Sequence, residues 1–149
     1  MARSSNPAAF LSPEETRLVE AATKAAEAET SAEIKLVIVR HSWKDLLVKA
    51  EGVFQKLGLE RTRDRNCVLI LLVTTNREFL IYGDRGIHEK VGQNFWDDVR
   101  DVMAAAFRKD RFGDGLVEGI ERMGRKLAQF FPRREDDTDE IPNEAAYEE

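Results

Sequence analysis

The chain is poor in the features that mark secreted, membrane-spanning and redox proteins. It has a single cysteine, Cys67, so an internal disulfide is excluded and a cysteine-based metal site is not expected. Its longest unbroken apolar run, residues 67–73, is strand-sized, whereas a membrane-spanning helix needs about 20 apolar residues. Residues 1–10 lack the apolar stretch of a signal peptide. These absences predict a soluble, cytoplasmic protein with no membrane insertion.

The sequence also lacks a basic surplus. The net charge is −5, but residues 133–149 alone carry two arginines against eight acidic residues, so the rest of the chain is close to neutral. A near-neutral folded part gives no reason to expect nucleic acid as a partner. Residues 133–149 are expected to form a disordered acidic tail, and residues 1–10 a flexible leader. A single α/β domain is therefore expected over residues 11–132.

Four stretches of this domain have the spacing of amphipathic helices. The first begins at Ser12, which can cap a helix that has Pro13 in its first position and Glu15 completing a capping box. Gly58 is expected to end the second helix in a left-handed conformation. The remaining boundaries are expected from Ser42 to Leu57, from near Asn94 to Phe107, and from about Asp114 to Phe131.

Three β-rich stretches, residues 34–39, 67–73 and 79–82, complete the domain. The first two flank a helix, which predicts a parallel pair with a right-handed crossover. A short polar turn joins the last two, which predicts an antiparallel hairpin with Asp84 opposite Cys67. We therefore expect an α/β fold, a three-layer α/β/α sandwich with a small mixed sheet in this strand order and helices on both faces. A fourth edge strand is compatible with the pattern, which does not indicate its position.

Four polar residues bracket these strands: Glu33, Asp64, Asn66 and Asp84. Because the first two strands are parallel and the third runs opposite to them, the four residues are expected at one edge of the sheet. Their oxygens suit a hard cation such as Ca²⁺ or Mg²⁺, and Asp84 is the best candidate for a catalytic residue. The alternative is an ion-pair network that closes the edge, in which neighbouring arginines neutralise the carboxylates: Arg63, Arg65 and Arg85.

Six short motifs keep their order along the domain: Leu11-Ser12-Pro13-Glu14-Glu15, Ser31-Ala32-Glu33-Ile34, Arg65-Asn66-Cys67-Val68-Leu69, Tyr82-Gly83-Asp84-Arg85-Gly86-Ile87, Phe95-Trp96 and Phe112-Gly113-Asp114-Gly115-Leu116. In these motifs the chain resembles the TPM domain family, named from a thylakoid lumen protein, a photosystem II repair protein and an acetylcholine-receptor modulator. The resemblance covers about residues 11–132. It implies an α/β/α sandwich, divalent-cation binding near the acidic positions in some members, and a weak acid phosphatase activity proposed for plant members.

The chain departs from this family pattern in three ways. Cys67 stands where the family usually has Gly after the Asn. The N-terminal strand with its Asp, common in the longer members, is missing, and with it an acidic ligand or catalytic group. The signal peptide or membrane anchor of many members is also missing, so the resemblance implies a stand-alone cytoplasmic version.

Two functions remain open from the sequence. The first is a divalent-cation-binding or interaction module, which holds an unknown protein partner through a helical face or the acidic tail. The alternative is a weak metal-dependent acid phosphatase that hydrolyses phosphomonoesters. The sequence lacks the phosphate-binding motif GxxxxGK[ST], the dinucleotide motif GxGxxG and the nucleophile motif GxSxG. It also lacks a DxD pair placed for phosphatase chemistry and a Cys-x5-Arg loop. These absences favour binding over catalysis.

Overall fold

The computed structural model describes residues 3–92, 94–134 and 141–149. Its elements follow the chain as α1 (Pro7–Phe10), α2 (Pro13–Glu27), β1 (Glu33–Val39), α3 (Leu46–Lys56), the 3-10 helix η1 (Leu59–Arg61), β2 (Cys67–Val73), β3 (Phe79–Gly83), α4 (Arg85–His88), α5 (Asp97–Arg108), α6 (Phe112–Phe130) and β4 (Ala146–Glu148). None of the helices in these residues is both long and apolar enough to cross a bilayer.

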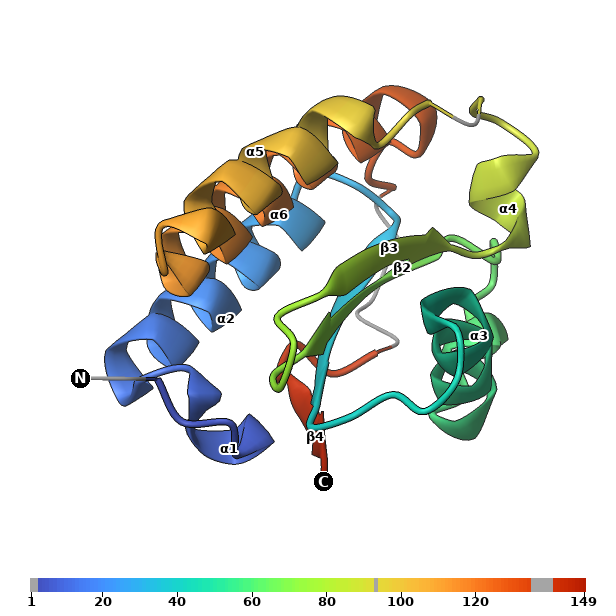
Figure 1. Ribbon diagram of the computed structural model, residues 1–149. Coiled ribbons are helices and arrows are strands. Elements are labelled where there is room, and N and C mark those ends of the chain that lie inside the picture. The colour runs from blue at the N-terminus through green and yellow to red at the C-terminus, as the bar shows by residue number, and fades with distance from the viewer. Residues whose placement is uncertain (1–2, 93, 135–140) are drawn as a thin grey trace.

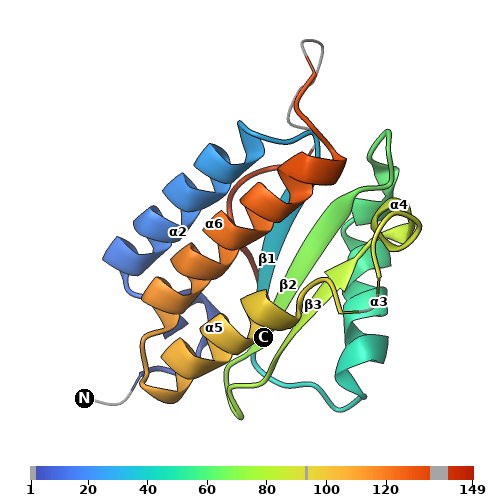
Figure 2. The same cartoon turned by 90° about the horizontal axis from the view of Figure 1, so that it is seen from above.

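Helices enclose the sheet on both faces (Figures 1 and 2). Helices α2, α5 and α6 cover one face, and α3 covers the other. Successive strand residues point to opposite faces, so each face has its own core. The α2 face buries Ile34, Leu36, Ile38, Val68, Ile70 and Leu72, and the α3 face buries Val37, Val39, Leu69, Leu71 and Val73. The expected three-layer α/β/α sandwich is confirmed.

The sheet has the strand order β3-β2-β1-β4. Strands β1 and β2 are parallel, and β2 and β3 are antiparallel, as the βαβ unit and the hairpin predict. Val68 pairs with Gly83, so Asp84 follows directly opposite Cys67, and its backbone N–H donates to the Cys67 carbonyl at 3.0 Å. All seven residues of β2 are buried, as are those of β1, and the two strands form the middle of the sheet.

Local capping explains where the helices begin. Ser12 Oγ accepts from the Glu15 N–H at 3.1 Å, and Glu15 Oε1 accepts from the Ser12 N–H at 2.9 Å, which completes the predicted capping box. Helix α3 begins later than predicted, because Asp45 rather than Ser42 caps it. The Ser42 hydroxyl instead donates to the Lys44 carbonyl in the preceding turn. Gly58 has φ of 68°, as expected of the residue that ends this helix.

The fourth strand lies in the segment that was expected to be disordered. Ala146 to Glu148 pair in parallel with Val37 to Val39 of β1, and Ile141 is only 8% exposed. The acidic composition of residues 133–149 therefore does not keep residues 141–149 off the domain. Their carboxylates form ion pairs with Arg40, just after β1, and with Lys49 of α3, which the composition of the segment alone does not reveal. Residues 135–140 of the predicted tail lie outside the described residues.

The leader also differs from its expectation. Pro7–Phe10 forms α1, with Asn6 as its cap, and Phe10 is 1% exposed. Phe10 packs edge-on against Phe112 with ring centroids 4.8 Å apart. Phe10 thus helps to hold this short segment on the domain, although a helix of four residues is too short to show an apolar period in the sequence. Residues 1 and 2 lie outside the described residues.

Candidate functional site

The amino-terminal edge of β1 and β2 holds the four polar residues singled out in the sequence. The Glu33 N–H lies 3.4 Å from the Asn66 carbonyl, and Asp84 follows the last residue of β3 at the same edge. Asp64 lies in the turn that leads into β2. The predicted convergence of these chain segments is therefore present, and the function of the edge depends on what each side chain contacts.

Asp84 is almost fully enclosed and both of its oxygens accept hydrogen bonds. Arg65 donates from Nε to Oδ2 at 2.8 Å and from Nη2 to Oδ1 at 2.9 Å, a bidentate ion pair. The Arg85 backbone N–H donates to Oδ1 at 2.7 Å, so Asp84 also caps α4. The side chain of Asp84 is 5% exposed. The hydrogen bonds between Arg65 and Asp84 raise the pKa of the Arg65 guanidinium. Asp84 therefore holds the loop before β2 against the start of α4.

This contact requires a residue without a side chain at position 86. The Gly86 N–H donates to the Arg65 carbonyl at 2.8 Å. A Cβ atom on Gly86 would lie 2.2 Å from the Asp64 carbonyl oxygen and 2.6 Å from that of Arg65, distances that no real Cβ atom tolerates. Arg65 itself has φ of 51°, in the left-handed region that non-glycine residues adopt rarely. The two loops are thus held in close backbone contact.

The other three side chains turn to separate partners. Asp64 forms an ion pair with Arg134. The amide Nδ2 of Asn66 lies 3.4 Å from Ser31 Oγ, and Glu33 Oε1 accepts from the Ile141 N–H at 3.1 Å. Asn66 and Glu33 are 2% and 3% exposed, whereas the side chain of Asp64 is 31% exposed. Asp64 is therefore the one member of the predicted set that a solute can approach.

The described residues contain no group of three or more His, Cys, Asp or Glu side chains arranged to hold a metal ion. The edge instead has the form of the alternative expected from the sequence, an ion-pair and capping network, in which Arg65 pairs with Asp84. The ligand set Glu33, Asp64, Asn66 and Asp84 stays a prediction, and each of these side chains has a separate partner in the protein.

A shallow pocket of about 280 Å³ borders this edge. Its walls include Asp64, Ser31, Glu89, Lys90 and Arg134. Lys90 Nζ lies 3.3 Å from the Phe130 carbonyl and 4.8 Å from the centroid of the Phe131 ring, so its ammonium is held at the rim. The pocket offers two carboxylates, one hydroxyl and two cationic groups to a small polar ligand.

Cys67 lies beneath this edge and is fully buried. Desolvation raises the pKa of its thiol well above the ordinary value, and the nearby carboxylates of Glu33 and Glu27 add to that effect. The thiol is thus held in its protonated, unreactive form. Cys67 is a small core residue, as its apolar neighbours in the sequence predict.

The opposite edge, at the carboxyl ends of β1 and β2, is where open α/β sheets usually bind ligands. Here residues 3–10 cover it. The Ser5 carbonyl accepts from Thr74 Oγ1 at 2.5 Å, just after β2, and Ser5 Oγ lies 3.4 Å from Arg40 Nη1, just after β1. The usual ligand-binding edge is therefore closed by the N-terminal segment of the same chain.

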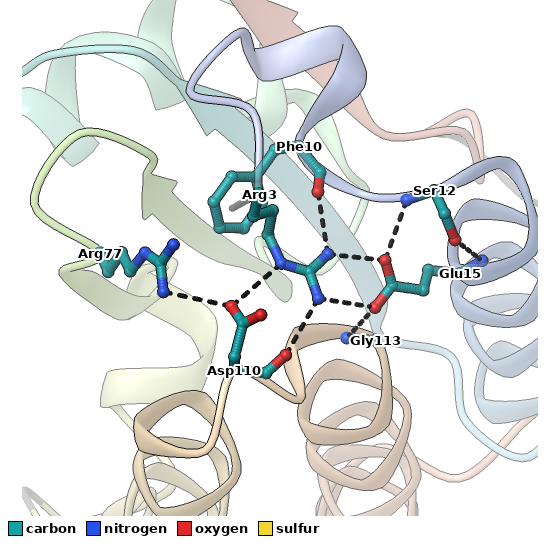
Figure 3. A network of polar contacts seen from close by, with 7 residues as sticks. All are labelled: Arg3, Phe10, Ser12, Glu15, Arg77, Asp110 and Gly113. Carbon is teal, nitrogen blue, oxygen red and sulfur yellow. Dashed lines mark hydrogen bonds and ion pairs between the residues drawn. The ribbon is translucent and has the colours of Figure 1, made fainter. Parts of the chain in front are cut away.

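Arg3 anchors this segment in a network that sequence reasoning missed (Figure 3). Its guanidinium donates to both oxygens of Glu15, at 2.6 and 3.2 Å, and to the Phe10 carbonyl at 2.9 Å. It also contacts Asp110, through Oδ1 at 3.3 Å and the backbone carbonyl at 3.0 Å. No signal in the sequence distinguishes Arg3 from an exposed arginine, because its two carboxylate partners are 12 and 107 residues away.

Arg134 was missed for a related reason, since it falls in the segment expected to be a disordered tail. It reaches Asp64, 70 residues earlier in the chain. Ser31, the partner of Asn66, appears in the sequence only as part of a family motif, with no chemical role attached. In each case the partner is separated from the predicted residue by many positions, so spacing in the sequence does not connect them.

The fold and this edge define a class of protein: a small α/β/α domain whose mixed sheet ends in a charge-compensated polar edge. The chain belongs to the TPM domain family, whose family model matches residues 4–126, and the resemblance noted from its motifs is thereby confirmed.

Two solved structures are similar to this chain. The BA42 protein from the psychrophilic bacterium Bizionia argentinensis, solved by NMR, is 38% identical with a TM-score of 0.88, over 93% of this chain and 95% of that chain. The N-terminal domain of a protein from P. gingivalis, also solved by NMR, is 18% identical with a TM-score of 0.69, over 85% of this chain and 82% of that chain. The second likeness shows the fold alone. A comparison with curated proteins gave no match.

Proposed function

We propose that this TPM domain is a binding module that takes Ca²⁺ or Mg²⁺ weakly at its polar edge, with Asp64 as the direct carboxylate ligand. The observation that carries the proposal is the environment of Asp64, which is 31% exposed and lines the pocket beside Ser31 and Glu89. Both cations bind through oxygen ligands, among which carboxylates are common, with water in the remaining positions.

A cation at this place competes with Arg134, whose side chain is 44% exposed. Exposed ion pairs contribute about 0–1 kcal/mol, so the ion pair is a small barrier to a divalent ion. The other residues of the predicted set, Glu33, Asn66 and Asp84, act indirectly in this proposal. They hold the two loops that shape the pocket, and their enclosed side chains already have protein partners. Because few protein ligands are present, binding in the millimolar range is expected.

Calcium titration of the isotopically labelled chain tests this proposal. We expect amide shifts around Ser31, Asp64 and Glu89, and we expect Asp64→Asn to weaken the response about tenfold, because it removes the charged ligand. Asp101→Asn is the matched control, since Asp101 is 77% exposed on α5. Equal weakening by both substitutions, or shifts confined to the acidic residues 141–149, would mean charge screening only. Shifts that are absent at about 10 mM metal would leave the edge as a structural network.

The alternative, a weak metal-dependent acid phosphatase, needs a carboxylate that is open to a phosphoryl group. Asp84 is the best candidate, but its two oxygens accept from Arg65 and from the Arg85 N–H, and its side chain is 5% exposed. This arrangement supports binding over catalysis.

We therefore expect no hydrolysis of p-nitrophenyl phosphate above the buffer rate, with Ca²⁺ or Mg²⁺ present, between pH 5 and 8. The measurement is release of p-nitrophenolate by the purified chain and by Asp64→Asn. Turnover that persists through purification and is lost in Asp64→Asn, while the fold is retained, would favour the phosphatase and contradict our proposal.

A further inference from the structure

We propose that the edge of β1 that faces away from β2 is a binding site for an extended acidic segment of a partner protein, and that residues 141–149 of this chain occupy it as an internal competitor. Figure 1 shows β4 at the end of the sheet, next to β1. The inference rests on the contacts that β1 and α3 make with this segment, and it does not require a cation at Asp64.

The buried ammonium of Lys35 requires hydrogen-bond acceptors at this edge of β1. Lys35 lies in β1 among apolar residues, on the α3 face, and is 8% exposed. Its ammonium donates to the Glu144 carbonyl at 2.5 Å and lies 3.4 Å from the Pro142 carbonyl. A buried ammonium without acceptors is costly. The edge of β1 is thus built to receive backbone carbonyls from an extended chain, and backbone contacts accept many sequences.

Three further cations make the same edge selective for acidic segments. Arg40 donates from Nε and Nη2 to Glu149 Oε1 at 2.9 and 2.6 Å. Lys49 Nζ lies 3.1 Å from Glu148 Oε1, and Lys56 Nζ lies 3.9 Å from the same atom. These cations come from the end of β1 and from one side of α3. A segment with two adjacent carboxylates fits them, which identifies the chemistry of the partner.

The internal segment is a weak occupant. Strand β4 pairs with three of the seven residues of β1, whereas β2 pairs with all seven. Its ion pairs are partly exposed, with 70% of the Glu149 side chain accessible, and such pairs contribute about 0–1 kcal/mol each. A segment of the same chain acts at an effective concentration of about millimolar. It therefore excludes ligands of lower affinity from the site and is displaced by ligands of higher affinity.

The test uses the full chain and an N-acetylated fluorescent peptide with the sequence of residues 141–149. Glu148→Lys/Glu149→Lys in the chain weakens the internal segment and leaves β1 and α3 unchanged. We expect this variant to bind the peptide at least about tenfold more tightly than the wild-type chain in fluorescence anisotropy, because the competitor is released. Binding should weaken with added salt and be lost when Lys49→Glu is introduced as well.

The control variant is Asp101→Lys/Glu121→Lys, which makes the same change in charge on α5 and α6, at residues that are exposed. Equal peptide binding by both variants, or equal binding of a peptide whose two terminal glutamates are lysines, overturns the proposal. A dimeric wild-type chain that separates on dilution would assign the edge to a second copy and also overturn it.

A second measurement needs no substitution. In the labelled wild-type chain, raising NaCl from about 0.05 to 0.5 M is expected to move the amides of residues 146–149 toward random-coil positions while those of β2 stay in place, since exposed ion pairs are screened. Residues 146–149 that keep their shifts in high salt would show a permanent strand and no available site.

Discussion

Gly86→Ala is expected to lower the free energy of unfolding by about 3 kcal/mol or more. The new Cβ would lie 2.2 Å from the Asp64 carbonyl oxygen and 2.6 Å from the Arg65 carbonyl oxygen. Both contacts are with backbone, which cannot turn away as a long side chain can. The loops would have to separate, and with them the hydrogen bond from Gly86 N–H and the alignment of Arg65 with Asp84. Urea unfolding followed by circular dichroism measures the loss.

Gly52→Ala is the matched control. Gly52 lies inside α3, and a Cβ there would meet nothing within 4 Å. Alanine is a better helix former than glycine, so this variant is expected to gain about 0.5–1 kcal/mol. A pair of variants that change stability by similar amounts in the same direction would contradict the close packing of the two loops. In Gly86→Ala, the separation of the two loops is also expected to abolish the cation response around Asp64.

Glu15→Gln is expected to lower the free energy of unfolding by about 2 kcal/mol, because the carboxylate accepts charge-assisted hydrogen bonds in a partly enclosed place. Its two oxygens accept from Arg3, from the Ser12 N–H at 2.9 Å and from the Gly113 N–H at 3.1 Å (Figure 3). Glutamine keeps the shape but loses the charge, and its amide N–H₂ would face donors. Glu14→Gln is the control: its side chain is 64% exposed and its partner Arg17 lies on the surface, so little change is expected.

The effect of Glu15→Gln should depend on pH in a defined direction. Desolvation by itself raises the pKa of Glu15, but the hydrogen bonds from Arg3, Ser12 and Gly113 and the charge of Arg3 outweigh it and hold the pKa below its ordinary value. A lowered carboxyl pKa stabilises the fold above the pKa of the unfolded chain, about 4.3, and this contribution is lost as the pH falls through the lower folded value.

The difference in stability between wild type and Glu15→Gln should therefore be complete at pH 7 and shrink below about pH 4. Thermal unfolding of both proteins at several pH values measures it. A difference that grows as the solution becomes more acidic would mean that Glu15 is not the charged centre of the network. A constant difference would mean that the loss comes from shape alone.

The fold could be predicted from local patterns because each of them acts over a few residues. The capping box of Ser12 and Glu15, the buried run of β2 and the short turn before β3 are contained within stretches of seven residues or fewer. The helix between β1 and β2 makes their parallel pairing the expected outcome. The prediction of a helix start was wrong at α3, because Asp45 accepts from the Leu47 N–H and caps the helix, while the Ser42 hydroxyl donates to the Lys44 carbonyl.

The candidate site could be located but its chemistry could not be derived. Strand direction places Glu33, Asn66 and Asp84 at one edge, so their neighbourhood follows from topology. The direction of each side chain does not. Asp84 turns to Arg65 and Asp64 turns to Arg134, so the carboxylates that a cation would need together have separate cationic partners. Each of these carboxylates lies at contact distance from an arginine, which compensates its charge without an ion from solution.

The sequence by itself determined the α/β order, the antiparallel hairpin, the position of Asp84 opposite Cys67 and membership of the TPM domain family. The first three features depend on the period of apolar residues and on short connections, which act locally, whereas family membership follows from six short motifs and the family model. Only the tertiary structure decided that residues 3–10 cover the carboxyl ends of β1 and β2, and that residues 141–149 add the strand β4 beside β1. Both segments are held by partners that lie up to 109 residues away in the sequence, such as Arg40 for Glu149. Such contacts depend on three-dimensional proximity, which composition and spacing within a short segment do not encode.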